Sequence, residues 1–262
     1  MFNIYKEMWV RRKMIHALSL QEIKKEYAGT VLGSIWGLVN PLMRIAVYWF
    51  VFSVGARAGG AVEDAPFMEW LAIGMVAWFV LNDGFRLSQK AYRSKRSLIK
   101  NTPFPIVILP AVQIVYSFYI HFILVIVILT VMAFSVNVSG YWLQILYYDF
   151  AGFMLLLGLG SVTAPLVAVS KDFGRFLDTV LIFLFWMTPI FWNVENAGSL
   201  AFLVKLNPFH YIVQGYRDSI FYSTGFWEHP LYSLYFWIVV LLLFVLGNYL
   251  YKRMKPVFLD IM

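Results

Sequence analysis

A polar stripe crosses one apolar segment near the start of the sequence. Trp36, Asn40, Arg44 and Tyr48 recur every four residues, so on a helix they lie along one face. A guanidinium in hydrocarbon costs several kcal/mol unless it faces protein or water. Two interpretations of Arg44 follow with equal weight: the stripe lines a polar pathway, or the side chain snorkels to the lipid headgroups.

Three further titratable side chains stand in apolar sequence. Asp83 lies close to the end of the next apolar run, where it is a candidate partner for Arg44 under either interpretation. His121 and Asp149 occur within later runs. Buried residues of these types are more often paired packing residues than members of a proton relay, so we expect these two to be buried and paired.

The chemistry of an enzyme is missing from the chain. It has no G-x-x-x-x-G-K-[ST] loop for nucleotide phosphates, no H-E-x-x-H metal motif and no G-x-S-x-G nucleophile motif. The absence of cysteine also removes thiolate metal sites. Ion-coupled transport usually shows several midplane ionisable residues and an internal repeat, and the sequence argues for neither. We therefore predict a transport subunit without catalytic residues, metal or bound cofactor, powered by a partner.

Composition determines the elements that must position these residues. Of the 262 residues 61% are hydrophobic and 13% charged, and the mean hydropathy is +0.72, which excludes a soluble globule. A bilayer core of about 30 Å needs roughly 20 apolar residues in a helix. Runs of this kind lie at 34–57, 67–86, 105–135, 142–169, 177–193 and 231–251. The run IHFILVIVILTVMAF does not alternate polar and apolar residues as a barrel strand does. We therefore predict that residues 1–262 form one domain, an all-α integral membrane protein with six transmembrane helices.

The basic residues predict how these helices are oriented. Most of the 21 Lys and Arg residues fall in the first 25 residues and at 86–100, 171–175 and 252–255. With an even number of spans these stretches share one side, and short cytoplasmic loops retain Lys and Arg. Both termini are therefore predicted to be cytoplasmic, and the net charge of +7 is a topology signal without nucleic acid as a partner.

The N-terminal segment 1–30 has the pattern of amphipathic helices lying on the inner leaflet. Ser19 followed by Glu22 is a capping-box pattern, which predicts that a second helix starts at Leu20. Two roles are open for this segment, an interfacial anchor or a helix that frames a cytoplasmic entrance.

Two loops have their own pattern. The segment LSQKAYRSKRSLIKNT at 87–102, which we call the coupling segment, has the length of a three-turn helix with basic and apolar positions. It is a candidate docking site for a partner, although the inside rule alone explains its charge. The apolar pieces within 194–230 are too short to span, and Pro208 divides them.

Several blocks together resemble the permease subunit of type-2 ABC exporters of polysaccharides and polyol phosphates. They are KKEYAGTVLGSIWGLVNPLM, SLIKNTPFPIVILPA, VSKDFGRFLDT, MTPIFW and LVKLNPFHYIVQGYRDSIFY, in the family order and over nearly the whole chain. Within the family, GYRDSIFYSTGFWEHP and KPVFLDIM most resemble the branch that exports wall teichoic acid, and export of O-antigen or capsular polysaccharide is the alternative.

The resemblance implies partners and a place in the cell. Family permeases work as homodimers in the bacterial plasma membrane, with two copies of a separate ABC subunit that hydrolyses ATP with Mg²⁺. It also implies a lipid-linked anionic glycopolymer as cargo, moved to the outer face, and a re-entrant segment at 194–230. An ion-coupled secondary transporter or flippase is the alternative from another class of protein.

The resemblance and the polar stripe together give candidate site residues. The coupling-helix residues implied by the resemblance are Lys90, Arg93, Lys95, Arg96, Ser97, Leu98 and Ile99, and the gate-helix residues are Tyr5, Trp9 and Arg12. The candidate substrate-channel residues are Trp36, Asn40, Arg44 and Tyr48 from the stripe, with Phe185, Trp186 and Thr188, which lie next to the helix-breaking Pro189.

Overall fold

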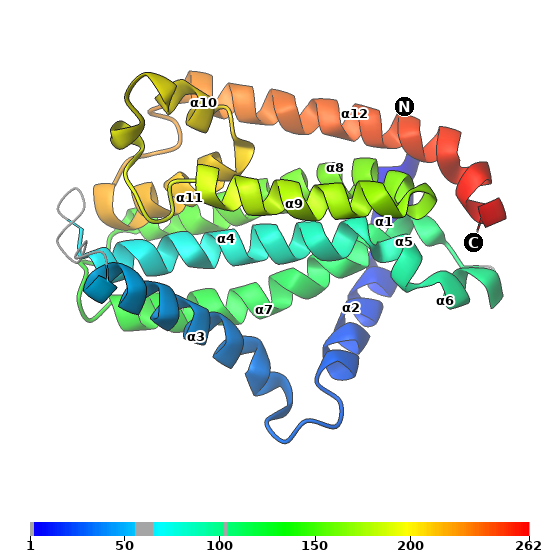
Figure 1. Cartoon of the computed structure of the whole chain (residues 1–262), viewed down its shortest axis with the longest axis horizontal. Coiled ribbons are helices and arrows are strands. Elements are labelled where there is room, and N and C mark those ends of the chain that lie inside the picture. Colours follow the sequence, from blue (N-terminus) through cyan, green and yellow to red (C-terminus); the bar gives the residue numbers. More distant parts are fainter. Residues whose placement is uncertain (1–2, 56–64, 102–103, 262) are drawn as a thin grey trace.

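The protein is a bundle of long helices, described by a computed structural model for residues 3–55, 65–101 and 104–261 (Figure 1). The regular elements in these ranges are helices, as predicted. The six helices that correspond to the predicted spans are α3 (Trp36–Phe50), α4 (Phe67–Gln89), α7 (Leu109–Met132), α8 (Ile145–Val169), α9 (Lys171–Met187) and α12 (Pro230–Ile261). The predicted ends of the first span at 57 and of the coupling segment at 102 lie outside the described residues.

Four stretches of the described chain are long and apolar enough to cross a membrane. They are Gly33–Val54, Ile106–Met132, Gly140–Val169 and Pro230–Val257, and they correspond to four of the predicted spans. The predicted spans 67–86 and 177–193 are absent from this set. The first corresponds to α4, which carries Glu69, Asp83 and Arg86, and the second to α9, which has only 17 residues.

The helix bounds differ most from prediction at α9. It begins at Lys171, where the hydroxyl of Ser170 accepts a hydrogen bond from the Phe173 amide at 3.2 Å, a typical N-cap. It ends at Met187, because Thr188 precedes Pro189 and adopts an extended conformation with φ −76° and ψ 126°. The predicted span 177–193 was therefore placed too far along the chain.

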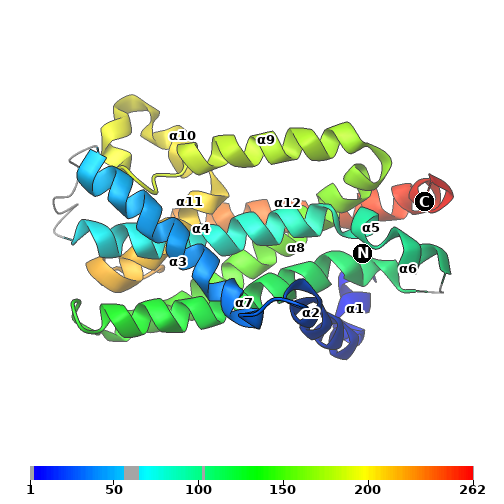
Figure 2. The ribbon, with the colours of Figure 1, turned by 60° about the horizontal axis from the view of Figure 1, so that its bottom comes forward.

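Helix α4 lies at the centre of the bundle, packed against α7, α8 and α11 (Pro208–Arg217) (Figure 2). Most of its side chains are buried by protein, so it does not need the apolar composition of a lipid-facing helix. On the other side of α8, glycines bring α12 close. A Cβ added at Gly158 would lie 2.8 Å from Cβ of Leu243, and one at Gly247 would lie 2.7 Å from Cβ of Ser161.

The first and last described helices, α1 (Asn3–Val10) and the C-terminal part of α12, lie at the same end of the bundle (Figure 1). This end, which we call the basic end, holds α1 (Asn3–Val10), α2 (Arg12–Glu26), α5 (Ala91–Ser94), α6 (Arg96–Asn101) and the last turns of α12. A hydrophobic cluster joins them, with Ile4, Met8, Tyr92, Ile108 and Tyr251 among its buried members. The opposite end, which we call the far end, holds α10 (Ala201–Lys205) and α11, short helices that match the predicted division at Pro208.

The N-terminal helices break at a different residue from the predicted one. The break falls at Arg11, and α2 runs without interruption through Ser19. The Ser19 side chain is buried and its hydroxyl lies 2.8 Å from the carbonyl oxygens of both Ile15 and Val112. The hydroxyl is thus used in packing α2 against α7, so the prediction of a new helix at Leu20 was wrong.

The coupling segment is not one helix of three turns. Helix α4 continues to Gln89, and the rest forms two short helices, α5 and α6, that meet at Lys95. Lys95 has φ −111° and ψ 23°, outside the helical range, which ends α5 there.

Candidate functional site

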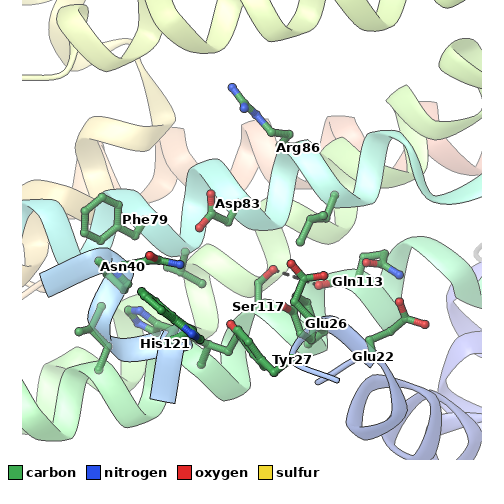
Figure 3. A pocket seen from close by; sticks show the side chains of 18 of the residues that line it. Glu22, Glu26, Tyr27, Asn40, Phe79, Asp83, Arg86, Gln113, Ser117 and His121 are labelled. Atoms are coloured by element: carbon green, nitrogen blue, oxygen red, sulfur yellow. Dashed lines mark hydrogen bonds between the residues drawn. The ribbon is translucent and has the colours of Figure 1, made fainter. Parts of the chain in front are cut away.

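A cavity of about 580 Å³ lies among the end of α2, α3, α4 and α7 (Figure 3). Helix α2 and the residue after it contribute Glu22, Lys25, Glu26 and Tyr27. The remaining polar and aromatic lining is Trp36, Asn40 and Arg44 of α3, Phe79, Asp83 and Arg86 of α4, Lys90, Ser94 and Lys95 of the coupling segment, and Gln113, Tyr116, Ser117 and His121 of α7. The cavity therefore combines both charges, amides, hydroxyls and aromatic rings.

The predicted stripe on α3 reaches this cavity with three of its four residues, Trp36, Asn40 and Arg44. The guanidinium carbon of Arg44 lies 5.8 Å from the ring centroid of Phe79 on α4. The candidate ion pair between Arg44 and Asp83 does not occur among the described contacts; instead Asp83 accepts a hydrogen bond from Asn82 at 2.8 Å. Arg44 and Asp83 thus face the same cavity from opposite helices.

The other candidate channel residues lie outside the cavity. Tyr48 and Phe185 pack together with ring centroids 5.7 Å apart, and Trp186 is 55% exposed on α9. Thr188 is fully buried, and its hydroxyl accepts a hydrogen bond from the Asn207 amide at 2.9 Å. A channel role for these four residues stays a prediction.

A buried polar cluster adjoins the cavity at His121, which is one of the lining residues (Figure 3). Nε2 of His121 is 2.8 Å from Oδ1 of Asp149 and 2.9 Å from the hydroxyl of Tyr216, which itself donates to the same carboxylate oxygen. All three side chains are buried, which confirms the expectation for His121 and Asp149. Tyr216 was missed, because 95 residues separate it from His121 and no sequence pattern connects them.

The three candidate gate-helix residues do not line the cavity. Tyr5 stacks on Phe244 of α12 at 4.2 Å and donates to its carbonyl oxygen at 3.2 Å, and burial raises the pKa of Tyr5 to about 12. Trp9 is 69% exposed, and the Arg12 guanidinium lies 5.0 Å from its ring centroid. The N-terminal residues that do line the cavity are Glu22, Lys25, Glu26 and Tyr27, of which the last three belong to the KKEY run at the start of the first family block.

Tyr27 lines the cavity, and its hydroxyl lies beside Gly37, the residue after Trp36 of α3. Burial raises its pKa, so it is a neutral hydroxyl at physiological pH. Gly37 permits this contact, since a Cβ there would lie 2.9 Å from the Tyr27 hydroxyl oxygen.

The candidate coupling residues divide into two groups. Lys90, Arg93 and Lys95 have partners within the chain: Asp178 at 2.7 Å, the Val167 carbonyl oxygen at 3.4 Å, and Glu22. Arg96 and Ser97 are exposed, and Leu98 and Ile99 are half-buried. Between Lys90 and Arg93, Tyr92 is buried, and this burial raises its pKa well above the usual value. Lys90, Arg93 and Lys95 thus contact other helices, whereas Arg96 and Ser97 form the exposed part of the segment.

At the far end, Arg217 is fully buried, within the segment 194–230 that was predicted to be re-entrant. Its guanidinium donates to the carbonyl oxygens of Pro189 and Ile190 at 2.6 and 3.0 Å, and lies 3.3 Å from the ring centroid of Trp70. Gly74 leaves room for it, since a Cβ there would lie 2.6 Å from Nη2. Arg217 therefore holds the chain reversal that follows α9.

Apolar helices of membrane-spanning length around a charged internal cavity define a polytopic membrane protein with a polar site. The chain belongs to the ABC-2 type transporter family, whose model matches residues 14–221. It is 23% identical over 228 residues to the O-antigen export system permease protein RfbA of Myxococcus xanthus, covering 85% of each chain. Two proteins of the same description from Klebsiella pneumoniae are 22% and 20% identical over 254 and 253 residues, covering 95% of each chain.

Family membership confirms the resemblance to type-2 ABC permeases, and thereby a membrane transport subunit. The finer resemblance to the teichoic acid branch is not confirmed, because the relatives are O-antigen export permeases.

Proposed function

We propose that this chain is the permease subunit of an ABC exporter that moves a lipid-linked cell-envelope polysaccharide of the O-antigen type. The observation that carries the proposal is that relatives described as O-antigen export permeases align with 85% to 95% of the chain. The cargo passes from the cytoplasmic to the outer face of the bacterial plasma membrane. Because the sequence lacks a phosphate-binding loop, ATP and Mg²⁺ are used by a partner subunit.

In this proposal six helices cross the membrane, including α4 and α9, with the basic end in the cytoplasm. The gathering of the basic stretches with both termini supports this orientation. Enclosure of α4 by protein supports its place as a span despite its polar residues. The short helices α10 and α11 then form the re-entrant segment on the outer side.

Two copies of the chain and two of the ATPase complete the transporter. The exposed surface of the coupling segment at Arg96 and Ser97 supports ATPase docking there. Large apolar side chains are exposed on α3 and α9, among them Val47, Phe183 and Trp186, as expected for helices that face lipid or the second copy.

The cavity is the proposed site of first contact with the cargo. Its cations suit the phosphate groups that join a polymer to its lipid carrier, and Trp36 and Phe79 offer rings to apolar sugar faces. Asn40, Gln113 and Ser117 add hydrogen-bonding groups for sugar hydroxyls.

One observation favours a second candidate, the teichoic acid type of polyol phosphate. The cavity is lined by more cations than acids, with Lys25, Arg44, Arg86, Lys90 and Lys95 against Glu22, Glu26 and Asp83. A cargo with a phosphate in every repeat would use Lys25 and Arg44, because Arg86, Lys90 and Lys95 already face the carboxylates of Asp178 or Glu22.

Reconstitution of the chain with its ATPase in vesicles separates the candidates. We expect ATP-dependent translocation of a lipid-linked neutral polysaccharide. Translocation of lipid-linked polyol phosphate alone would establish the second candidate. Transport by the chain alone under an ion gradient, without the ATPase, would establish a secondary transporter and overturn both.

A further inference from the structure

The coupling segment is tied to two neighbouring helices by carboxylates. On α9, Asp178 accepts hydrogen bonds from Gln89 at 3.0 Å and Lys90 at 2.7 Å, and Arg86 lies 3.9 Å away. On α2, Glu22 forms an ion pair with Lys95. The two attachments therefore differ, with several donors on Asp178 and one described ion pair on Glu22.

The difference follows from where the donors lie. Gln89 and Lys90 belong to the end of α4 and the residue after it, next to the buried side chains of Ala91 and Tyr92. This attachment is part of the packed body. Lys95 instead stands at the joint between α5 and α6, directly before the exposed residues Arg96 and Ser97.

Glu22 lies on the part of α2 that faces the cavity. Earlier in α2, His16 contacts the Tyr119 hydroxyl and Ser19 contacts the Val112 carbonyl oxygen, which fixes those turns on α7. The following turn carries Glu22, Lys25 and Glu26, which all line the cavity. Lys95 thus holds the one turn of α2 that borders the cavity.

The Lys95–Glu22 ion pair is also well shielded for a surface contact. The side chains are 15% and 23% exposed, compared with 81% and 88% for Arg175 and Asp172 of α9. Shielded ion pairs are less weakened by solvent and salt than exposed ones.

We infer that Glu22 is a positioning residue for energy coupling. Through Lys95 it passes a displacement of the exposed coupling segment to the turn of α2 that borders the cavity. The inference rests on the proposed docking of an ATPase on this segment, and it assigns Glu22 no contact with ATP. An open Lys95–Glu22 pair leaves ATP hydrolysis in place but uncouples it from movement of the cargo.

The test is a charge swap in the complex reconstituted with its ATPase. Glu22→Lys and Lys95→Glu are each expected to lower polymer exported per ATP hydrolysed by about fivefold, while the double variant restores it. Glu22→Gln, which keeps an oxygen acceptor, is expected to cause a smaller loss. The matched control is Asp172→Lys, which opens the exposed pair with Arg175 at the same end and is expected to leave the ratio unchanged.

Copurification of the ATPase distinguishes a failure of the proposed ATPase docking from a failure of the inference about Glu22. If the wild-type chain binds no ATPase, the proposed docking fails and the inference fails with it. If every variant binds the ATPase and the swap does not restore the ratio, the inference alone is overturned. A single variant that fails to assemble supports the inference only if the double variant assembles and regains the wild-type ratio of polymer exported to ATP hydrolysed. A general folding defect would not be reversed by the second substitution.

Discussion

Two arginines of this protein lie in different surroundings. Arg217 at the far end is fully buried, with two backbone carbonyls and the Trp70 ring around its guanidinium. Arg44 on α3 faces the cavity, with the Phe79 ring 5.8 Å from its guanidinium carbon. A guanidinium engaged by the backbone is committed to the fold, whereas one that faces a cavity is placed to meet a ligand. The surroundings of Arg217 thus indicate a structural role at the far end, and those of Arg44 agree with the proposal that the cavity receives cargo.

The largest effect is expected at the far end. Arg217→Ala leaves two buried carbonyl oxygens without their donor and removes the filling of the space beside Gly74. We expect a loss of about 3 kcal/mol in stability, seen as a lower thermal midpoint and lower yield of purified protein. Arg217→Lys, which keeps the charge but not the two parallel donors, is the control and should lose less. Normal stability of Arg217→Ala would contradict the structural role of Arg217.

The cluster between the two regions should respond less. Tyr216→Phe removes the hydroxyl that donates to Asp149, a hydrogen bond to an acidic group inside the bundle. We expect a loss of about 2 kcal/mol in stability, measured by thermal unfolding in detergent. Tyr211→Phe is a comparison on the same helix, since the Tyr211 hydroxyl bonds only neutral hydroxyl groups among the described contacts, at 2.9 Å to Tyr147 and Ser233. An equal loss in both variants would argue against a special role for the acidic cluster.

At the cavity we expect a substitution to lower transport and to leave stability unchanged. Arg44→Ala should lower ATP-dependent export about tenfold, the loss of one charged contact of roughly 1.4 kcal/mol, with unchanged yield and thermal midpoint. Arg44→Lys should retain part of the activity, because an ammonium still attracts phosphate. If Arg44→Ala instead fails to assemble, Arg44 has a structural role like that of Arg217, and the proposed difference between the two arginines is wrong.

The smallest effect is expected on the exposed surface of the basic end. Arg96→Glu should lower copurification of the ATPase about threefold, since single exposed charge pairs contribute little. Lys171→Glu, an exposed reversal at the start of α9, is the matched control. Equal ATPase binding by the Arg96 variant would place the docking surface elsewhere.

The sequence predicted some parts of this arrangement because the signals are local. Helical spacing placed Trp36, Asn40 and Arg44 on one face, and the structure brings them to one cavity. Composition predicted the helical membrane class, and motif order predicted the family.

Other parts were out of reach because they depend on contacts between distant segments. The capping-box pattern at Ser19 was wrong because a carbonyl of α7 uses the hydroxyl. Charge alone did not separate Lys95, paired with Glu22, from the exposed Arg96. The burial of Arg217 likewise depends on the reversal after α9, which only the folded chain creates.

The most direct test of the account is protection of the cavity by cargo. The chain has no cysteine, so single cysteines at Asn40 in the cavity and at Ser97 on the exposed coupling segment give matched labelling sites. The probe is a lipid-linked O-antigen-type polysaccharide added to the purified permease before a thiol reagent. The account predicts that the polysaccharide slows labelling of Asn40→Cys and leaves Ser97→Cys unchanged. Labelling of Asn40→Cys at the same rate with and without saturating polysaccharide would contradict it.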